Sequence, residues 1–217
     1  MNWVKKLAGF LIDLLAPEEQ RLNRLLSLDE ESMKRLLPSS PVRINDVFVL
    51  FDYRNKIVKM IIKSIKYKNN LSMKNRIAGY LCDEIIEISS DVALFDGSPP
   101  LLVGMPMSKN EKLNRGFNQT EELVFDIRRL SGNNIEISTA VLEKFRETKR
   151  QTSLGKKERA QNVKNSMAAN PRELAKIKNR TIIVLDDVYT TLASFNEAKR
   201  ALLADGAKRV IGLFIAH

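Results

Sequence analysis

Two kinds of apolar pattern divide the chain. Residues 1 to about 40 place apolar side chains at the three-and-four spacing of amphipathic helices, interrupted at Pro17 and ended by the Pro and Ser residues of LPSSP. Beyond this boundary, continuous apolar runs such as IIVL and VIGLFIA alternate with helical patterns, as is typical of buried parallel strands. The pattern therefore predicts a helical N-terminal appendage over residues 1–40 and an α/β domain over residues 41–217.

The elements of this α/β domain alternate along the chain. Strands are expected at 46–53, 101–106, 182–185 and 209–216, with β-favouring segments near 135–137 and 140–145. Helices are expected at 54–67, 71–88, 117–130 and 194–204, and MSKNEKLNRG (107–116) reads as a polar turn. Such alternation predicts a mainly parallel central sheet flanked by helices, with ligands at the carboxyl ends of the strands.

Charge is distributed unevenly. The whole chain carries a net charge of +10, and residues 144–180 alone hold 12 Lys and Arg against 3 Asp and Glu. A localised basic segment indicates a polyanionic ligand, such as a phosphate ester, pyrophosphate or nucleic acid. The alternative is a solvated segment that is basic for solubility. The candidates for nucleic-acid contact are Arg146, Lys149, Arg150, Lys156, Lys157 and Arg159.

The remaining composition excludes several classes of protein. Cys82 is the single cysteine, which excludes an internal disulfide framework and a cysteine-rich zinc site and points to a reducing compartment. The N-terminal apolar stretch is interrupted by Asp13 and is too short to span a bilayer. Its apolar stripe, from Trp3 to Leu15, is expected to pack on the protein's own body or on a partner subunit rather than on a membrane surface. A cytoplasmic protein without a membrane span is expected.

The stretch TIIVLDDVYTTLASFNEA (181–198) holds an unusual arrangement of polar side chains. Asp186 and Asp187 follow an apolar strand and precede a turn that contains Thr190 and Thr191. Adjacent carboxylates at a strand end repel each other and lose hydration, so they need donors, which the vicinal hydroxyls of a ribose supply. The amide groups of a following helix suit a phosphate. The stretch therefore predicts a site for a sugar diol and a phosphate.

The start of that following helix has a second interpretation. Ser194 and Glu197 have the spacing of a capping box, in which the serine hydroxyl accepts a hydrogen bond from a first-turn amide. The helix is therefore expected to begin near Ser194. Capping and phosphate binding can both occur at this helix, because the start of a helix offers several free amide groups.

Two levels of resemblance follow from these residues. IIVLDDVYTT.AS resembles the phosphoribosyl pyrophosphate (PRPP) signature of type I phosphoribosyltransferases. YRNKIVKMIIKSIKYKNN, VGMPMSKNEKLNRGFNQTEEL, RETKRQTSLGKKERAQNV and the 186–210 stretch follow one another as in the ComF family, amidophosphoribosyltransferase-like proteins linked to natural competence for DNA uptake. The resemblance covers about residues 47–217. Its most specific parts are RGFNQ (115–119) and the pattern of Gln151, Leu154, Arg159 and Asn162.

The resemblance implies a type I phosphoribosyltransferase fold and a set of site residues. Asp186 and Asp187 match the acids that hold the ribose hydroxyls, and the phosphate loop corresponds to Thr190, Thr191, Leu192, Ala193 and Ser194. Ser108 and Lys109 match the loop that holds pyrophosphate. Lys149 and Arg150 fall in a loop that closes over PRPP, where they would stabilise charge. Mg²⁺ would bridge pyrophosphate and ribose with few direct protein ligands.

The chain departs from the family pattern at two places. ComF-like proteins usually carry a cysteine-rich zinc module near the N-terminus, whereas residues 17–40 contain no cysteine, so no zinc is expected. Leu192 stands where the signature has glycine. A leucine at positive φ costs on the order of 1 to 2 kcal/mol and could occupy ligand space, whereas at negative φ this cost vanishes.

Three functions stay open at this point. The chain is a phosphoribosyltransferase that releases pyrophosphate from PRPP, a catalytically inactive accessory protein of competence that binds single-stranded DNA or a partner through its basic segment, or a sensor that binds PRPP without turnover. The expected partners are PRPP or a nucleotide-like ligand, single-stranded DNA, a competence or replication-restart protein, and a second copy in a homodimer.

Overall fold

The centre of the protein is a parallel sheet. The computed structural model describes residues 17–40, 42, 44–146, 163–190 and 192–217. These residues form a five-stranded sheet in the order β1-β7-β6-β2-β3, in which every neighbouring pair is parallel. Its strands are β1 (Val47–Phe51), β2 (Leu101–Gly104), β3 (Ile137–Ser138), β6 (Thr181–Val188) and β7 (Arg209–Ala216). The predicted mainly parallel sheet is confirmed.

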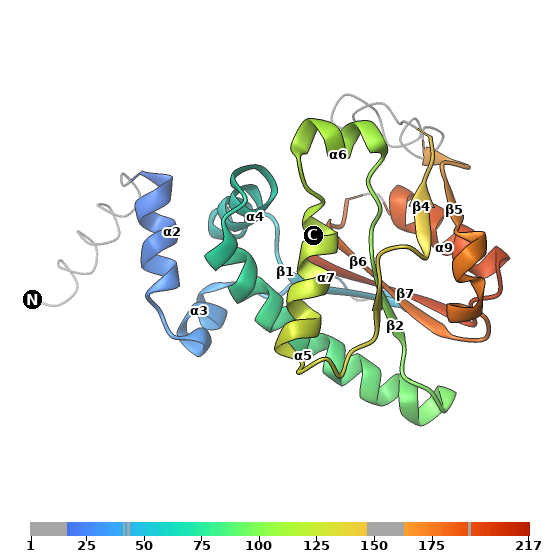
Figure 1. Cartoon of the computed structure of the whole chain (residues 1–217). Coiled ribbons are helices and arrows are strands. Elements are labelled where there is room, and N and C mark those ends of the chain that lie inside the picture. Colours follow the sequence, from blue (N-terminus) through green and yellow to red (C-terminus); the bar gives the residue numbers. More distant parts are fainter. Residues whose placement is uncertain (1–16, 41, 43, 147–162, 191) are drawn as a thin grey trace, which may run out of the picture.

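Helices cover both faces of this sheet (Figure 1). One face packs against α4 (Lys56–Lys68), α5 (Leu71–Asp96) and α7 (Gln119–Leu130), and the other against α9 (Ala193–Ala204). The side chains of β6 alternate between the two cores, with Ile183 and Leu185 in the first and Ile182 and Val184 in the second. This alternation is the period-two geometry of a strand buried on both sides.

The described N-terminal residues form two helices, α2 (Glu18–Leu26) and α3 (Glu30–Leu36). Leu22, Leu25 and Met33 are buried in the same core as α4 and α5. The stripe from Trp3 to Leu15 lies outside the described residues, and the boundary at residue 40 stays a prediction.

A second, smaller sheet stands beside α9. It pairs β4 (Leu142–Lys144) with β5 (Met167–Ala169) in antiparallel fashion, and a 3₁₀ helix, η2 (Pro171–Lys176), follows. The sequence did not predict β5 or η2. The basic segment, residues 144–180, therefore begins at the last residue of β4 and contains β5 and η2, while residues 147–162 lie outside the described part of the chain.

The structure corrects two predicted elements. The predicted polar turn at 107–116 is largely a helix, α6 (Lys109–Arg115), which Ser108 and Glu111 begin as a capping box. Its single apolar side chain, Leu113, is exposed, so no apolar period marks the helix in the sequence. The second helix of the domain, α5, continues well beyond residue 88 to Asp96, because Val92 extends its buried face before Gly97 ends it in a left-handed conformation.

These features match the predicted fold class. An α/β chain with a parallel five-stranded sheet, flanking helices and N-terminal helices is consistent with the type I phosphoribosyltransferase fold. In the described part of the chain, no helix is both long enough and apolar enough to cross a membrane.

Close contact between β2 and α7 predicts a sensitive glycine. A Cβ on Gly104 would lie 3.1 Å from the backbone carbon and oxygen of Thr120, so Gly104→Ala should force the two elements apart and lower the free energy of unfolding by about 1–3 kcal/mol. Gly79→Ala, inside α5, is the matched control, since its Cβ would meet only a side-chain oxygen of Glu30. Urea unfolding measures both. An equal effect of the two substitutions would contradict the close contact.

Candidate functional site

The acid pair lies at the carboxyl end of β6, inside the strand. Because side chains alternate along a strand, Asp187 follows Ile183 and Leu185 toward α4 and α7, whereas Asp186 follows Ile182 and Val184 toward the opposite face. The predicted strand 182–185 extends to Val188, so both carboxylates belong to it. The two neighbours in sequence therefore have different surroundings.

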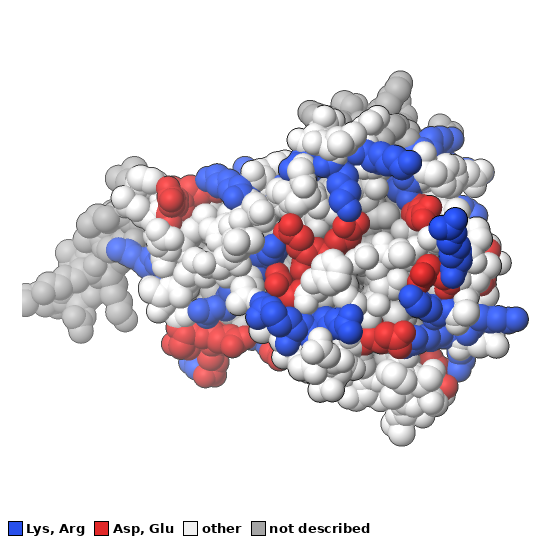
Figure 2. Space-filling model, in the orientation of Figure 1, with Lys and Arg blue, Asp and Glu red and all other residues white. Residues whose placement is uncertain are grey.

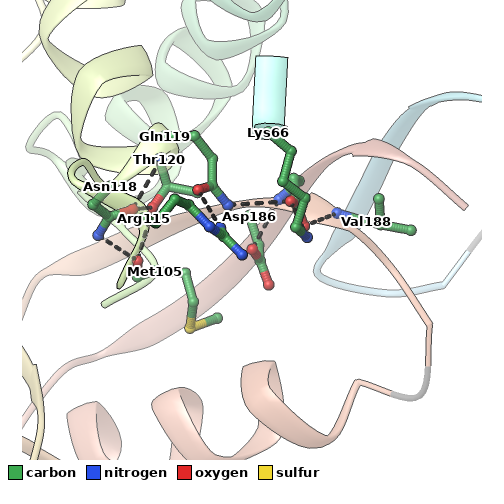
Figure 3. A network of polar contacts seen from close by, with 9 residues as sticks. Lys66, Met105, Arg115, Asn118, Gln119, Thr120, Asp186 and Val188 are labelled. Atoms are coloured by element: carbon green, nitrogen blue, oxygen red, sulfur yellow. Dashed lines mark hydrogen bonds and ion pairs between the residues drawn. The ribbon is translucent and has the colours of Figure 1, made fainter. Parts of the chain in front are cut away.

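Asp187 is held by three protein groups, Lys66, Gln119 and the Val188 amide, and Figure 3 labels these partners. Its Oδ2 lies 2.5 Å from Nζ of Lys66 and accepts a hydrogen bond from Nε2 of Gln119 at 3.2 Å, while its Oδ1 accepts from the Val188 amide at 2.8 Å. Only 6% of the residue is exposed. Burial alone would lower the pKa of Lys66, but the charge and hydrogen bond of Asp187 outweigh it and raise that pKa above its usual value.

The RGFNQ motif positions Gln119. Gly116 ends α6 at φ 83°, a left-handed conformation that favours glycine, and Asn118 caps α7 through the Thr120 amide while its Nδ2 donates to the Met105 carbonyl. Gln119, the first residue of α7, accepts from Arg115 at 2.7 Å and donates to Asp187. The motif thus links the end of β2 to the acid pair.

Asp186 has much less support. Its Oδ1 accepts the Asp187 amide at 2.8 Å, and no side chain among the described residues forms a hydrogen bond or ion pair with it. Burial of its carboxyl, and then the neighbouring charge of Asp187, raise the pKa of Asp186 to about 7. Near neutral pH this carboxyl is therefore poised between its two protonation states, and it gains from any ligand that brings hydrogen-bond donors or positive charge.

The turn after β2 places Ser108 and Lys109 differently. Ser108 is buried, and its hydroxyl accepts the Glu111 amide as the cap of α6, whereas Lys109 is exposed. Glu111 in turn pairs with Lys144 at 2.9 Å, which ties α6 to β4. Burial would raise the pKa of Glu111, but the hydrogen bond of Lys144 and the Ser108 amide hold it below its usual value. This turn is thus fixed to the small sheet.

The turn after β6 differs from its predicted form. The predicted capping box is wrong: α9 begins at Ala193 with Leu192 as its N-cap, and Glu197 bonds the Met167 amide and Arg200 instead. Leu192 has φ 54°, the costly left-handed conformation, and its side chain is partly buried against the second core. A leucine has no side-chain oxygen with which to cap the helix.

The remaining loop residues are placed only in part. Thr190 is exposed at the mouth of the turn, and Ser194 lies in the first turn of α9. The other predicted residues of the phosphate loop and of the basic segment lie outside the described residues: Thr191, Lys149, Arg150, Lys156, Lys157 and Arg159. Arg146, at the edge of that segment, donates to the Lys164 carbonyl.

Two functional residues had no role assigned from sequence. Lys66 comes from the last turn of α4, more than a hundred residues before its partner, and one lysine among the five of that helix carries no distinguishing signal. Gln119 lies in RGFNQ, a motif that is specific to the family resemblance but to which the sequence alone assigns no role. Only the folded chain brings both to Asp187.

Metal ligation rests on few residues. In the part of the chain that the structure describes, no group of three or more His, Cys, Asp or Glu side chains could hold a metal ion. Carboxylate oxygens are ligands that Mg²⁺ accepts, and only the Oδ1 of Asp186 accepts a hydrogen bond from a described residue. Mg²⁺ carried by a ligand, and the expected absence of zinc, both stay predictions.

The fold is consistent with the type I phosphoribosyltransferase fold, and the acid pair lies at the carboxyl end of its central strand β6. Comparison with known proteins adds two distant relatives. The chain is 23% identical to "DNA utilization protein YhgH" of Escherichia coli O157:H7 over 153 residues, which are 70% of this chain and 64% of that protein. It is 24% identical to "Competence protein F" of Haemophilus influenzae over 171 residues, or 76% of this chain and 70% of that protein.

These two distant homologues bear out the resemblance to the ComF family. No family model matches the chain. The matched region covers 64% of the E. coli protein, so the chain spans less than two thirds of that relative's length.

The raised pKa of Asp186 predicts a pH dependence of stability. Its folded pKa of about 7 lies above the ordinary value of about 3.9 for an unfolded chain, so between these values the folded protein binds more protons. The free energy of unfolding should therefore fall as pH rises through this window, and Asp186→Asn should remove that contribution. Urea unfolding from pH 4 to pH 8 tests it. Identical pH dependence in wild type and variant would contradict the raised pKa.

Loss of the ion pair between Lys66 and Asp187 should lower the stability of the protein more than loss of a surface lysine does. Lys66→Met leaves the buried Asp187 without its cation and should lower the free energy of unfolding by about 3 kcal/mol, and the double variant Lys66→Met/Asp187→Asn should recover most of this. Lys63→Met, on the exposed side of the same helix, is the control and should change stability by less than about 0.5 kcal/mol. If Lys66→Met and Lys63→Met had the same cost, the ion pair would not support the site.

Proposed function

We propose that the chain binds PRPP, or a related ribose 5-phosphate, at the carboxyl ends of β6 and β2. The observation that carries this proposal is the difference between the two acids. Asp187 already has its partners within the protein, whereas Asp186 has a raised pKa and one oxygen without a side-chain partner among the described residues. Two vicinal hydroxyls bring the donors that stabilise this carboxylate when it is ionised. Asp186 would contact the ribose hydroxyls directly, and Asp187 would orient the strand end.

The start of α9, which follows the acid pair in the chain, supports a nearby phosphate site. The helix has twelve residues, and its N-cap, Leu192, makes no side-chain hydrogen bond to the first-turn amides. Such amides carry the positive end of the helix dipole and bind phosphate oxygens readily. The side chain of Leu192 packs toward the second core, which leaves the amide side of the turn for a ligand. Thr190, Thr191, Ala193 and Ser194 would complete this cradle.

The diphosphate end of PRPP would rely on cations. Lys109 is exposed at the start of α6, which follows the turn after β2, and Lys149 and Arg150 are the further candidates. Mg²⁺ would supply charge neutralisation of the diphosphate when bound. With these charges offset, a nucleophile would form a bond to C1 of PRPP while the bond from C1 to pyrophosphate breaks and pyrophosphate leaves, which is phosphoribosyl transfer.

The names of the relatives support a setting for this activity. They refer to competence and to DNA utilisation. A ribose-phosphate site on a competence-family protein would therefore serve nucleotide metabolism or ligand sensing connected with the use of incoming DNA.

Ligand-induced stabilisation tests the binding proposal. PRPP with Mg²⁺ at about 100 times its Kd should stabilise the wild type by about 2.7 kcal/mol, seen as a rise in Tm. Asp186→Asn should fold with at least wild-type stability near neutral pH, yet lose this shift. Leu192→Gly should keep or increase it, because glycine adopts positive φ without strain. An equal Tm rise in Asp186→Asn and wild type would overturn the proposal.

Pyrophosphate release separates transfer from binding alone. An active transferase should release pyrophosphate from PRPP faster than the Asp187→Asn variant does. Equal rates in both proteins, together with a PRPP-dependent Tm shift, would assign the site to ligand sensing.

A further inference from the structure

One exposed face of α4 carries only cations and an aromatic ring. Lys56, Lys59, Lys63 and Tyr67 are spaced by three, four and four residues, so they lie along one side of the helix, and all four are exposed. We call these four residues the α4 stripe. The helix contains no acidic residue, although it carries five lysines.

The three lysines of the α4 stripe form no ion pair with a described carboxylate. The other two lysines of the helix have partners, since Lys66 pairs with Asp187 and Lys68 with Glu18. Within residues 17–40, 42, 44–146, 163–190 and 192–217, no carboxylate forms an ion pair with Lys56, Lys59 or Lys63. Their positive charge is therefore directed to solvent without neutralisation by described residues.

An aromatic ring lies at each end of the α4 stripe with a cation near it. Nζ of Lys59 is 5.6 Å from the ring centroid of Tyr53, and the guanidinium of Arg115 is 5.8 Å from that of Tyr67. Tyr67 is 68% exposed. A large, exposed ring beside fixed cations is the combination with which proteins stack an unpaired base while holding its phosphates.

The surface of α7 differs from the α4 stripe because it carries both acidic and basic side chains. There the acidic residues Glu121, Glu122 and Asp126 pair with basic neighbours, and Figure 2 shows red and blue side chains next to one another on this face. Such a surface has little net attraction for a polyanion. The α4 stripe differs because nothing of opposite sign interrupts it.

We propose that the α4 stripe, with Tyr53 and Arg115 at its ends, binds single-stranded nucleic acid. Lys56 and Tyr67 are eleven positions apart in α4, which is about 16 Å at the rise of an α-helix. This length is enough for a few nucleotides of one strand. The lysines bind phosphates and Tyr67 stacks on a base, which requires an unpaired strand. This surface is separate from residues 144–180, where the sequence predicted DNA contacts, and it does not depend on ribose-phosphate binding.

Salt-dependent binding of a fluorescently labelled oligodeoxythymidylate to the full chain tests this surface. Lys56→Gln/Lys59→Gln/Lys63→Gln should weaken binding at low salt by at least tenfold and reduce the slope of log K against log salt concentration by about 2. Tyr67→Ala should weaken binding by roughly five- to a hundredfold, whereas Tyr67→Phe should retain most of it.

A matched variant removes the same charge elsewhere. Lys34→Gln/Arg35→Gln/Arg128→Gln alters three exposed cations outside both the α4 stripe and residues 144–180, and should change the affinity less than about threefold. Equal losses in the two triple variants would overturn the proposal, because net charge alone would then explain binding. So would unchanged binding in Tyr67→Ala, or a preference for anionic lipid vesicles over the oligonucleotide. Thermal unfolding of each variant confirms that it is folded.

Discussion

A carboxylate as deeply buried as Asp187 is costly unless a cation and donors accompany it, and this requirement organises the site. Lys66 supplies the cation from the end of α4, and Gln119 supplies a donor from the start of α7. The contact therefore joins two helices to the end of the central strand β6. Arg115 extends the same chain of hydrogen bonds to the end of α6. The positions of these helices and the geometry of the acid pair depend on one another.

Two residues of the site are held in states that cost free energy of folding. Asp186 is held where its charge is disfavoured, and Leu192 adopts a left-handed conformation that costs a leucine on the order of 1 to 2 kcal/mol. Local departures of this kind concentrate at functional sites, where surrounding structure offsets them. Both lie at the carboxyl end of β6, the edge at which parallel sheets bind ligands. Their coincidence is a physical argument for a ligand at this edge.

The sequence predicts the architecture well and the contacts poorly. Apolar runs identify buried strands such as β6, and the acid pair is recognisable because two adjacent carboxylates have no structural use alone. The helix α6 has no apolar face, so the sequence shows no helical period there. The capping box at Ser194 is wrong because the N-cap of α9 is Leu192, two residues earlier. The partners of Asp187 come from distant segments, and only the packing of α4 and α7 on the sheet brings them together. The N-terminal boundary and the residues of the basic segment stay predictions.

We propose that Lys66 and Gln119 hold Asp187 in place, whereas Asp186 and the start of α9 receive a ribose 5-phosphate. A crystal structure with ribose 5-phosphate bound measures this most directly. The account predicts the sugar hydroxyls within hydrogen-bond distance of Asp186, the phosphate at the amides of Ala193 and Ser194, and the contact between Lys66 and Asp187 retained. A phosphate bound elsewhere, with Asp186 left without a ligand hydroxyl, would contradict it.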